Sequence, residues 1–308
     1  MKWTADRLPD LTGTTAVVTG ANSGIGWHTA RALAARGARV VLAVRDAERG
    51  KQAADRIKSS VAAADLDVAN LDLASMASVR AFGDGWAEPL DLLVNNAGVM
   101  APPKRLMTED GFELQFGTNH LGHFVLTGLL LRALVNSPRG RVVTVSSTAH
   151  HVGKADVLEG NAGGAYDPQH AYGNSKLANL LFMRELQRQF EDRGLPVVST
   201  AAHPGVAATG LVSDPQGMGA NRFVRAVAPL FLTLFTQSAA AGARATLFAA
   251  AEAEPGSFTG PRRLAESRGA IGPANLSAEA KDEKLGRRLW HVSEEMTGFH
   301  YTWPEALS

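Results

Sequence analysis

The sequence predicts an α/β fold, a doubly wound parallel sheet, and two observations lead to it. Over the first 205 residues, short apolar runs bounded by Gly, Asp, Asn or Pro alternate with helix-length segments. The first run is followed by a glycine-rich turn that opens the first helical segment. Buried parallel strands are typically such continuous apolar runs. Their alternation with helices implies right-handed βαβ units and helices on both faces of the sheet.

The elements follow in chain order. We expect strands at 15–19, 39–44, 62–67, 90–95, 141–146 and 197–202, with helices between them at 24–36, 46–59, 75–86, 112–134 and 172–192. The third strand has two candidate ends, Asp67 and Asp72. Farther along the chain, we expect a helix at 238–253, a short strand at 257–259, a loop at 260–275 and a final amphipathic helix at 278–296.

The length suits one domain with a sizeable core, so residues 1–308 are expected to form a single Rossmann-type unit. Within it, 14–205 is the cofactor-binding and catalytic core, 206–255 a substrate lid region, and 256–308 a C-terminal strand, loop and helix. The strongly apolar stretch at 223–235 is compatible with a lid, a core helix or a partner-binding face, and the sequence leaves these three open.

Composition excludes several classes of function. The formal net charge is +1, which provides no basic footprint for nucleic acid. The absence of cysteine excludes disulfides, thiolate nucleophiles and cysteine-bound metals, and the histidines show no metal-ligand spacing, so no metal is expected. The N-terminus lacks a signal peptide, and the most apolar windows are too interrupted to span a membrane. We therefore expect a cytoplasmic protein with no integral membrane segment.

The glycine-rich turn predicts a dinucleotide site. Glycines let the backbone turn tightly and approach a pyrophosphate, and the following helix presents free N–H groups and the positive end of its dipole. A glycine turn without a ligand is the alternative, but the strand–turn–helix context argues against it. The expected cofactor-binding residues here are Gly20, Asn22, Ser23, Gly24, Ile25 and Gly26.

The end of the second strand bears on the choice of cofactor. An acidic residue there would bind the ribose hydroxyls of NAD, whereas arginine pairs with the 2′-phosphate of NADP. Val44 occupies the position where the acid is expected and Arg45 follows it, which favours NADP (NADPH) over NAD. The alternative is that Arg45 is a solvated residue of the next helix, which Asp46 caps.

Tyr172 and Lys176 are spaced to lie on one face of a helix and form the candidate acid–base pair. A free phenol titrates near pH ~10, so catalysis at neutral pH calls for a lowered pKa. We expect the ammonium and an oxidised nicotinamide to lower it by about three units, which takes roughly 4 kcal/mol. A surface helix pair without a catalytic role is the alternative reading of the spacing.

The neighbouring segments strengthen the catalytic reading. Ser147 ends the fifth strand at the carboxyl edge, where open α/β sheets bind ligands. Its hydroxyl can hold the substrate oxygen. Ser146 is the alternative candidate for this catalytic serine. Asn119 lies within a helix that it disfavours, either as an outward polar residue or as a carboxamide that bends the helix and anchors a water. Small residues after the fourth strand let adenosine lie against the backbone at Asn96, Ala97 and Gly98.

Taken together, these motifs resemble the short-chain dehydrogenase/reductase family over residues 14 to about 260. The resemblance implies a catalytic tetrad of Asn119, Ser147, Tyr172 and Lys176, with Tyr172 and Lys176 also contacting the cofactor. It further implies cofactor contacts at the residues after the third and sixth strands and in the segment beyond them: Asp72, Leu73, Pro204, Gly205 and Thr209. A small-molecule carbonyl or alcohol is the implied substrate, and a lipophilic one is expected from 223–235.

Within the family, the sequence is most similar to the retinol dehydrogenase and protochlorophyllide reductase branch, which mostly uses NADP. The likeness lies at 147–151, 175–179 and 203–206. Two departures are the lack of an N-terminal membrane anchor and the lack of cysteine, which argues against protochlorophyllide reduction. The long step from Ser147 to Tyr172 matches this branch, and its segment 152–169 could block the family's dimer surface, so a monomer and a homodimer both stay open. A dinucleotide-binding regulator without turnover is the alternative function.

Overall fold

The computed structural model describes residues 3–205 and 238–304. The strands are β1 (Thr15–Thr19), β2 (Arg39–Val44), β3 (Leu66–Asn70), β4 (Leu92–Asn95), β5 (Arg141–Val145), β6 (Val198–Ala202), β7 (Phe258–Arg263) and β8 (Arg268–Pro273). Within these ranges they form one sheet in the order β3-β2-β1-β4-β5-β6-β7-β8. Neighbouring strands from β3 to β7 pair in parallel, and β8 is antiparallel to β7. The doubly wound α/β fold expected from the sequence is therefore confirmed.

The longer helices are α1 (Gly24–Ala34), α2 (Ala47–Lys58), α3 (Met76–Asp84), α5 (Gly122–Leu129), α7 (Pro168–Asp192), α9 (Ala239–Ala251) and α11 (Glu283–Thr297). Shorter helical turns are η1 (Ala5–Arg7), α4 (Leu114–Phe116), η2 (Gly117–Leu121), α6 (Leu131–Val135), η3 (Thr148–His151), η4 (Ala155–Glu159) and α10 (Ala278–Lys281). No helix in the described ranges is long and apolar enough to cross a membrane.

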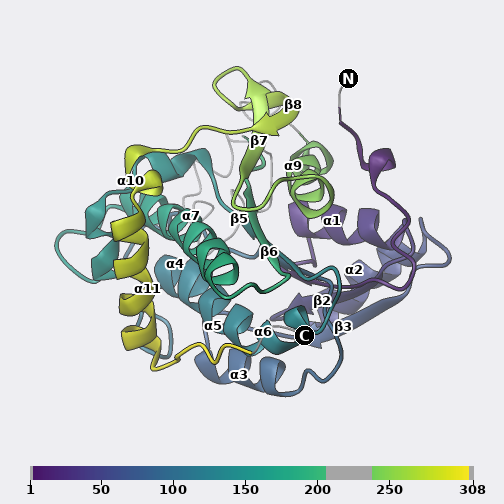
Figure 1. Cartoon of the computed structure of the whole chain (residues 1–308), viewed down its shortest axis with the longest axis horizontal. Helices are drawn as coiled ribbons and strands as arrows, with labels where there is room; N and C mark the ends of the chain where they lie inside the picture. Colours follow the sequence, from purple (N-terminus) through teal and green to yellow (C-terminus); the bar gives the residue numbers. More distant parts are fainter. Residues whose placement is uncertain (1–2, 206–237, 305–308) are drawn as a thin grey trace.

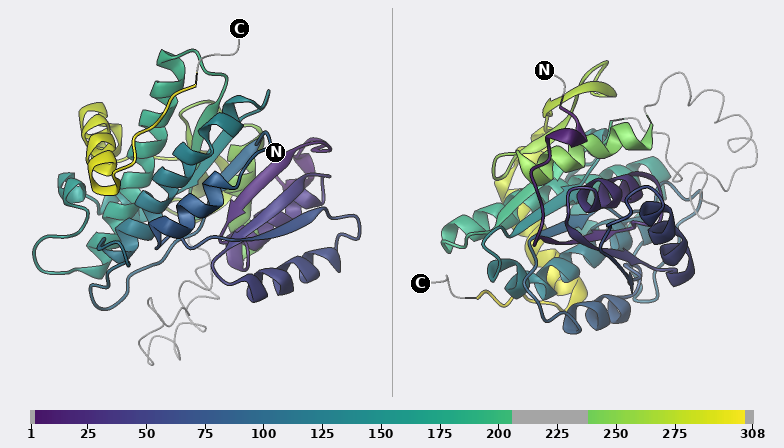
Figure 2. Two further views of the ribbon diagram at one scale, coloured as in Figure 1. Left: turned by 90° about the horizontal axis from the view of Figure 1, so that it is seen from below. Right: turned by 90° about the vertical axis from the view of Figure 1, so that its right-hand side faces the viewer.

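The sheet lies between two helical layers, as Figures 1 and 2 show. Alternate side chains of a strand point to opposite faces, and both faces are buried here. Val17 packs in the core beneath α3, α5 and α7, whereas Ala16 and Val18 pack in the core beneath α1, α2 and α9. Two buried faces explain why these strands are continuously apolar.

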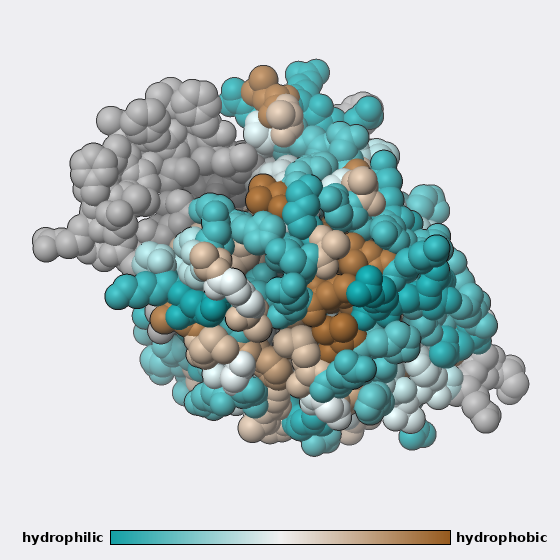
Figure 3. Space-filling model, turned by 90° about the vertical axis from the view of Figure 1, so that its left-hand side faces the viewer, coloured by the Kyte–Doolittle hydropathy of each residue, from teal (hydrophilic) through white to brown (hydrophobic). Residues whose placement is uncertain are grey.

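The C-terminal part of the chain forms an outer layer over α7. Trp290 of α11 contacts the rings of Phe124 and Phe182, and Tyr301 donates its hydroxyl hydrogen to the Phe124 carbonyl oxygen at 2.7 Å. This layer holds α7, which carries the candidate catalytic pair, firmly against the sheet. Figure 3 shows one side of the molecule, where apolar residues gather in the centre between hydrophilic ones.

Two sequence expectations fail in the first half of the chain. The third strand lies at Leu66–Asn70 rather than 62–67, because the residues after α2 complete that helix with turns and β2 pairs only with the later segment. The helix expected at 112–134 is interrupted. It begins at Leu114, where the Glu113 side chain caps it, passes through the π-turn η2 and breaks at Leu130, whose ψ is 0°.

Three more expectations fail later in the chain. The catalytic helix begins at Pro168 instead of Tyr172, because Asp167 caps it and proline suits its first turn. The expected loop at 260–275 is instead the hairpin of β7 and β8, whose Gly, Pro and Arg content hid the strand pattern. The final helix divides into α10 and α11 because Asp282 leaves the helical conformation to cap α11.

The expected lid region is only partly described. Its second half, α9, lies in the helical layer against α1 and β6. The first half, with Thr209 and the apolar stretch 223–235, lies outside the described residues.

Candidate active site

The topology brings the predicted site residues to one edge of the sheet. Because β1, β4, β5 and β6 run parallel, their carboxyl ends lie side by side. The glycine turn follows β1, Asn96 follows β4, Ser147 follows β5 and Pro204 follows β6. Ligands of open α/β sheets bind at this edge, where the strand order reverses next to β1.

The glycine turn has the form of a phosphate cradle. Gly20 and Gly24 have φ of +66° and +56°, which favour glycine. A Cβ at Gly26 would lie 2.5 Å from both the Gly20 carbonyl oxygen and Asn96 Nδ2, so the helix approaches the turn closely. The Ser23 side chain makes no capping bond, which leaves the first N–H groups of α1 available to an anion. These residues fit a dinucleotide.

Thr19 joins this cradle to the segment after β4. Its hydroxyl oxygen accepts from the backbone N–H groups of Asn96 and Ala97, each at 2.9 Å, and Asn96 Nδ2 donates to the Thr19 carbonyl oxygen at 2.7 Å. One more contact here was not predictable from the sequence. Arg56 of α2 donates to the Asn22 carbonyl oxygen at 2.9 Å and supports the turn from outside.

The two remaining cofactor positions lie at the ends of β2 and β3. Asp46 caps α2 by accepting from the Arg49 N–H at 3.0 Å, as the alternative interpretation of this segment expected. Arg45 is exposed at the carboxyl end of β2. Asp72 accepts from the Ala74 N–H at 2.9 Å, and the buried Leu73 packs against α5 near Gly122.

Tyr172 and Lys176 lie in α7 and are both buried, at 8% and 4% exposure. The Tyr172 side chain hydrogen-bonds to that of Ser147. Lys176 Nζ lies 5.7 Å from the centre of the Tyr172 ring and donates to the Val145 carbonyl oxygen at 3.2 Å. The structure thus brings Ser147, Tyr172 and Lys176 together at the carboxyl end of β5.

Burial is the largest influence on the pKa values of Tyr172 and Lys176. It raises the pKa of Tyr172 to about 12, against a smaller lowering by the Ser147 hydrogen bond. It lowers the pKa of Lys176 to about 8. Within the protein itself the phenol pKa therefore shifts upward, because the cost of a buried phenolate exceeds the hydrogen-bond stabilisation. Tyr172 is consequently a neutral phenol at pH 7, the form that can donate a proton. The lowering that we expect when an oxidised nicotinamide adds its charge stays a prediction.

Asn119 lies in the π-turn η2, where the regular α-helical pattern is interrupted. Its Oδ1 accepts from the Val99 N–H at 2.8 Å, and its Nδ2 donates to the Val99 carbonyl oxygen at 3.0 Å and to Ser175 Oγ at 2.9 Å. Both carboxamide hydrogens are used within the protein, and the water that we expect Asn119 to anchor stays a prediction. A Cβ at Gly98 would lie 2.9 Å from Asn119 Oδ1 and 3.5 Å from Lys176 Nζ.

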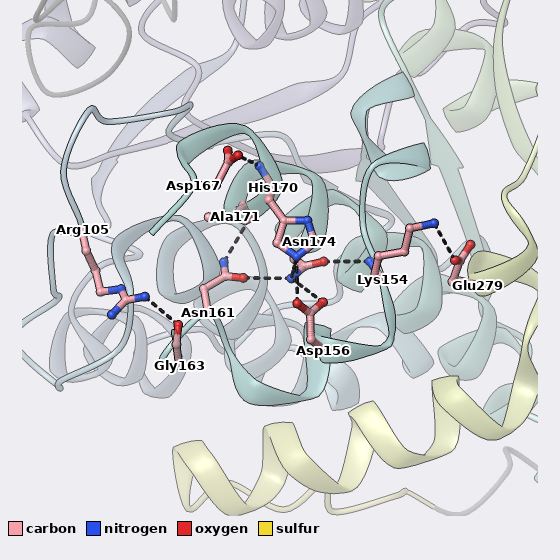
Figure 4. A network of polar contacts seen from close by, with 10 residues as sticks. All are labelled: Arg105, Lys154, Asp156, Asn161, Gly163, Asp167, His170, Ala171, Asn174 and Glu279. Carbon is pink, nitrogen blue, oxygen red and sulfur yellow. Dashed lines mark hydrogen bonds and ion pairs between the residues drawn. The ribbon is translucent and has the colours of Figure 1, made fainter. Parts of the chain in front are cut away.

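The segment 152–169 is fastened to the first turns of α7 by a network that the sequence analysis missed. Asn174 lies at its centre, as Figure 4 shows. Its Oδ1 accepts from the Lys154 N–H at 3.0 Å, and its Nδ2 donates to Asp156 Oδ1 at 3.1 Å and Asn161 Oδ1 at 3.2 Å. Asn174 follows Tyr172 by two residues, so this network fixes the turn that carries the phenol.

Two buried histidines support the same edge. His150 Nδ1 lies 2.7 Å from the Ser147 carbonyl oxygen, and burial lowers its pKa to about 4. The Gly205 N–H donates to His203 Nδ1 at 3.2 Å, and burial also lowers the pKa of His203 to about 4. Each histidine is neutral at pH 7 and fastens the backbone of a site residue. Gly205 itself has φ +69°.

Comparisons with known proteins agree with this arrangement. The sequence profile of a family described as short chain dehydrogenase matches residues 14–216. Retinol dehydrogenase 12 of Homo sapiens is 40% identical over 294 residues, which cover 94% of this chain and 88% of that protein. Polyprenol dehydrogenase of Mus musculus is 43% identical over 298 residues, with 94% and 86% covered.

Two solved structures are also similar. The crystal structure of an uncharacterized protein from Mycobacterium Paratuberculosis has a TM-score of 0.81 and 43% identity, with 98% of this chain and 100% of that chain covered. A structure assigned as an NAD(P)-dependent gluconate 5-dehydrogenase from Beutenbergia cavernae, with bound NADP, has a TM-score of 0.61 and 25% identity, with 81% and 95% covered.

Proposed function

This chain belongs to the short-chain dehydrogenase family, in the branch that contains the retinol dehydrogenases, and we propose that it is an NADP-dependent reductase or dehydrogenase of lipophilic compounds. Membership makes it an oxidoreductase that acts on CH–OH groups and takes an NAD(P) cofactor. The observation that carries the finer proposal is the meeting of Ser147, Tyr172 and Lys176 beside the glycine cradle.

In the proposed mechanism the nicotinamide cofactor supplies or accepts the hydride. Tyr172 gives its phenolic proton to the substrate oxygen in reduction, and Ser147 orients that oxygen by a hydrogen bond. Lys176, still largely protonated at pH 7 with its pKa of about 8, places a positive charge beside the phenol as its proton leaves. Asn119 holds Val99 and Ser175 in place around this pair.

Arg45 supports the proposed preference for NADP. The side chain is exposed directly after β2, at the edge where the adenosine ribose of a dinucleotide lies in doubly wound folds. A guanidinium can form two parallel hydrogen bonds with one phosphate group. At the end of β2, Val44 occupies the position where a carboxylate would bind the ribose hydroxyls of NAD. Asp72, Leu73, Pro204, Gly205 and Thr209 complete the proposed cofactor contacts.

Three observations support a lipophilic substrate. Relatives at about 40% identity are named retinol dehydrogenases and a polyprenol dehydrogenase, which are named for lipophilic alcohols. The apolar stretch 223–235 is the proposed lid over such a substrate. Apolar side chains also reach the surface at Leu106, Met107, Val152 and Leu264. A cytoplasmic location and the choice between monomer and homodimer stay predictions, the latter to be checked by light scattering.

The proposal is tested by titrating the pure protein with NADPH and NADH by fluorescence, followed by turnover of a panel of lipophilic aldehydes and ketones. We expect tighter binding of NADPH and turnover of long apolar carbonyls. Tyr172→Phe is the matched variant and should lose about 10²–10⁴-fold in kcat while still binding NADPH. Binding without turnover across the panel would favour the regulator alternative, and binding of neither cofactor would refute the proposal.

A further inference from the structure

His123 lies in α5, one turn after Asn119, and is 1% exposed. Its ring lies between the two halves of the site. Nε2 is 2.9 Å from the hydroxyl oxygen of Thr19, and Nδ1 is 3.0 Å from the main-chain carbonyl oxygen of Asn119. One side chain therefore bridges the strand that leads into the glycine cradle and the residue that frames the catalytic helix.

The partners determine which ring nitrogen carries the proton. The Asn119 carbonyl oxygen can only accept, so Nδ1 must be the donor to it. The Thr19 hydroxyl oxygen already accepts two backbone N–H groups, from Asn96 and Ala97. Its one hydrogen faces two acceptors, His123 Nε2 at 2.9 Å and the Val94 carbonyl oxygen at 3.3 Å, and we assign it to the shorter contact. The neutral Nδ1–H form of the ring matches this assignment, since it donates to Asn119 from Nδ1 and accepts the Thr19 hydrogen at Nε2.

The surroundings disfavour a second proton on this ring. Burial lowers the pKa of His123 to about 4, and the positive charge of Lys176 adds to the lowering. The neutral form is thus retained across the pH range in which an enzyme of this kind operates, and the donor and acceptor roles of the two nitrogens stay fixed.

We propose that His123 is a positioning residue that sets the cofactor cradle and the catalytic helix relative to each other, its Nδ1–H holding Asn119 and its Nε2 holding Thr19. The inference rests on the proposed function. On one side, Thr19 holds the N–H groups of the segment that follows β4. On the other, Asn119 Nδ2 donates to Ser175 Oγ, which in turn donates to the Tyr172 carbonyl oxygen at 2.8 Å.

Two variants separate the two halves of the bridge. Asparagine places an amide nitrogen where Nδ1 lies but is too short to reach Thr19, so His123→Asn keeps the bond to Asn119 only. Glutamine extends an amide oxygen toward Nε2, so His123→Gln keeps the bond to Thr19 only. We expect His123→Asn to weaken NADPH binding about three- to tenfold with kcat nearly unchanged, and His123→Gln to lower kcat about three- to tenfold with NADPH binding nearly unchanged.

His120→Asn is the matched control. His120 is equally buried and lies one turn earlier, but its Nε2 is 2.8 Å from Ser293 Oγ of α11, away from the site. This variant should lower the Tm as the His123 variants do, without altering the NADPH Kd or kcat. Equal effects of the two His123 substitutions on Kd and kcat, or no effect beyond a lowered Tm, would refute the positioning role.

A spectroscopic measurement tests the bridge independently of turnover. Nitrogen-15 NMR of the histidine rings should show the Nδ1–H form for His123, assigned by its absence in the variants, without change between about pH 5 and 8. An Nε2–H form would overturn the proposal. Failure of the proposed function would be seen separately, as absence of NADPH binding or turnover in the unmodified protein.

Discussion

Ser146 donates its hydroxyl hydrogen to the main-chain carbonyl oxygen of Lys176 at 2.8 Å, so this serine serves the backbone of α7. Its neighbour Ser147 hydrogen-bonds to the Tyr172 side chain and also caps η3 by accepting from the Ala149 N–H at 3.1 Å. This division supports Ser147 over the alternative serine as the residue that binds the substrate oxygen.

The first prediction follows from that division. Ser147→Ala should lower kcat by about 10²–10³-fold, as loss of a donor to a reacting oxygen does, with NADPH binding retained. Ser146→Ala should mainly destabilise the fold, by about 1 kcal/mol, as measured by urea unfolding. A larger loss of turnover in Ser146→Ala than in Ser147→Ala would reverse the assignment.

The second prediction concerns the cost of burying Lys176. At pH 7 its ammonium is charged in a site that lowers its pKa to about 8 from 10.5. Lys176→Met removes that charge, and Val145 keeps a donor because Asn179 Nδ2 also bonds to its carbonyl oxygen at 3.1 Å. We expect the variant to lose turnover yet to be more stable at pH 7, by at most about 3 kcal/mol.

The pH dependence of this gain follows from the sign of the shift. Between about pH 8 and 10.5 the unfolded chain keeps a proton on Lys176 that the folded chain has lost. The stability of the unmodified protein therefore rises with pH across this window relative to the variant, and the gap closes. Urea unfolding of both proteins at pH 7 and pH 9.5 checks this; a variant that is less stable at pH 7, or a gap that stays constant, would contradict it.

The third prediction uses the close approach of α1 to the glycine turn. Gly26→Ala places a methyl group 2.5 Å from the Gly20 carbonyl oxygen, so the turn must shift. We expect NADPH binding to weaken by at least about tenfold and stability to fall by about 1–3 kcal/mol. In the control Gly286→Ala in α11, the nearest atom to the new Cβ is 3.8 Å away. That variant should instead gain about 0.5–1 kcal/mol, with unaltered binding.

The fourth prediction tests Arg45. Arg45→Ala should reduce the NADPH/NADH preference by about 10-fold or more, since a guanidinium–phosphate pair contributes about 1.5–3 kcal/mol when charge-assisted. The measurement is the ratio of the two Kd values, with Arg49→Ala, whose side chain pairs with Asp46 at 3.3 Å, as the neighbouring control. If the ratio of the two Kd values is unchanged in Arg45→Ala, Arg45 is a solvated surface residue and does not bind the 2′-phosphate of NADP.

The spacing of apolar residues in the sequence was enough to locate most strands and helices, because both faces of the sheet are buried. β1 and β2 have the bounds expected from their apolar runs, and the helices that follow them differ from the expected bounds by at most two residues at either end. The edges of the sheet were harder. β3 has only exposed and half-buried residues at the edge of the sheet, and β8 has a single buried residue, Gly272, so neither stands out from loop composition. Pairing with a neighbouring strand decided both.

The candidate site divides in the same way. The residues of the glycine turn and the pair in α7 were predictable because each set is local in sequence, and a helix or a strand end fixes its geometry. The residues that hold these groups in place were not predictable, because their hydrogen-bond partners are distant in the sequence. Asn174 binds segments reached only after the chain folds back, and His123 bridges Thr19 and Asn119 across 104 residues of sequence and within one turn of helix.

The sequence by itself determined the α/β class, the order of the βα units, the dinucleotide turn and the identity of the candidate acid–base residues, since these depend on backbone propensity and hydrophobic period. Only the tertiary structure decided which serine faces Tyr172 and where the carboxamide of Asn119 bonds. It also decided that burial raises the phenol pKa to about 12. Desolvation and long-range hydrogen bonding depend on what packs around a group, and no local pattern in the chain encodes that.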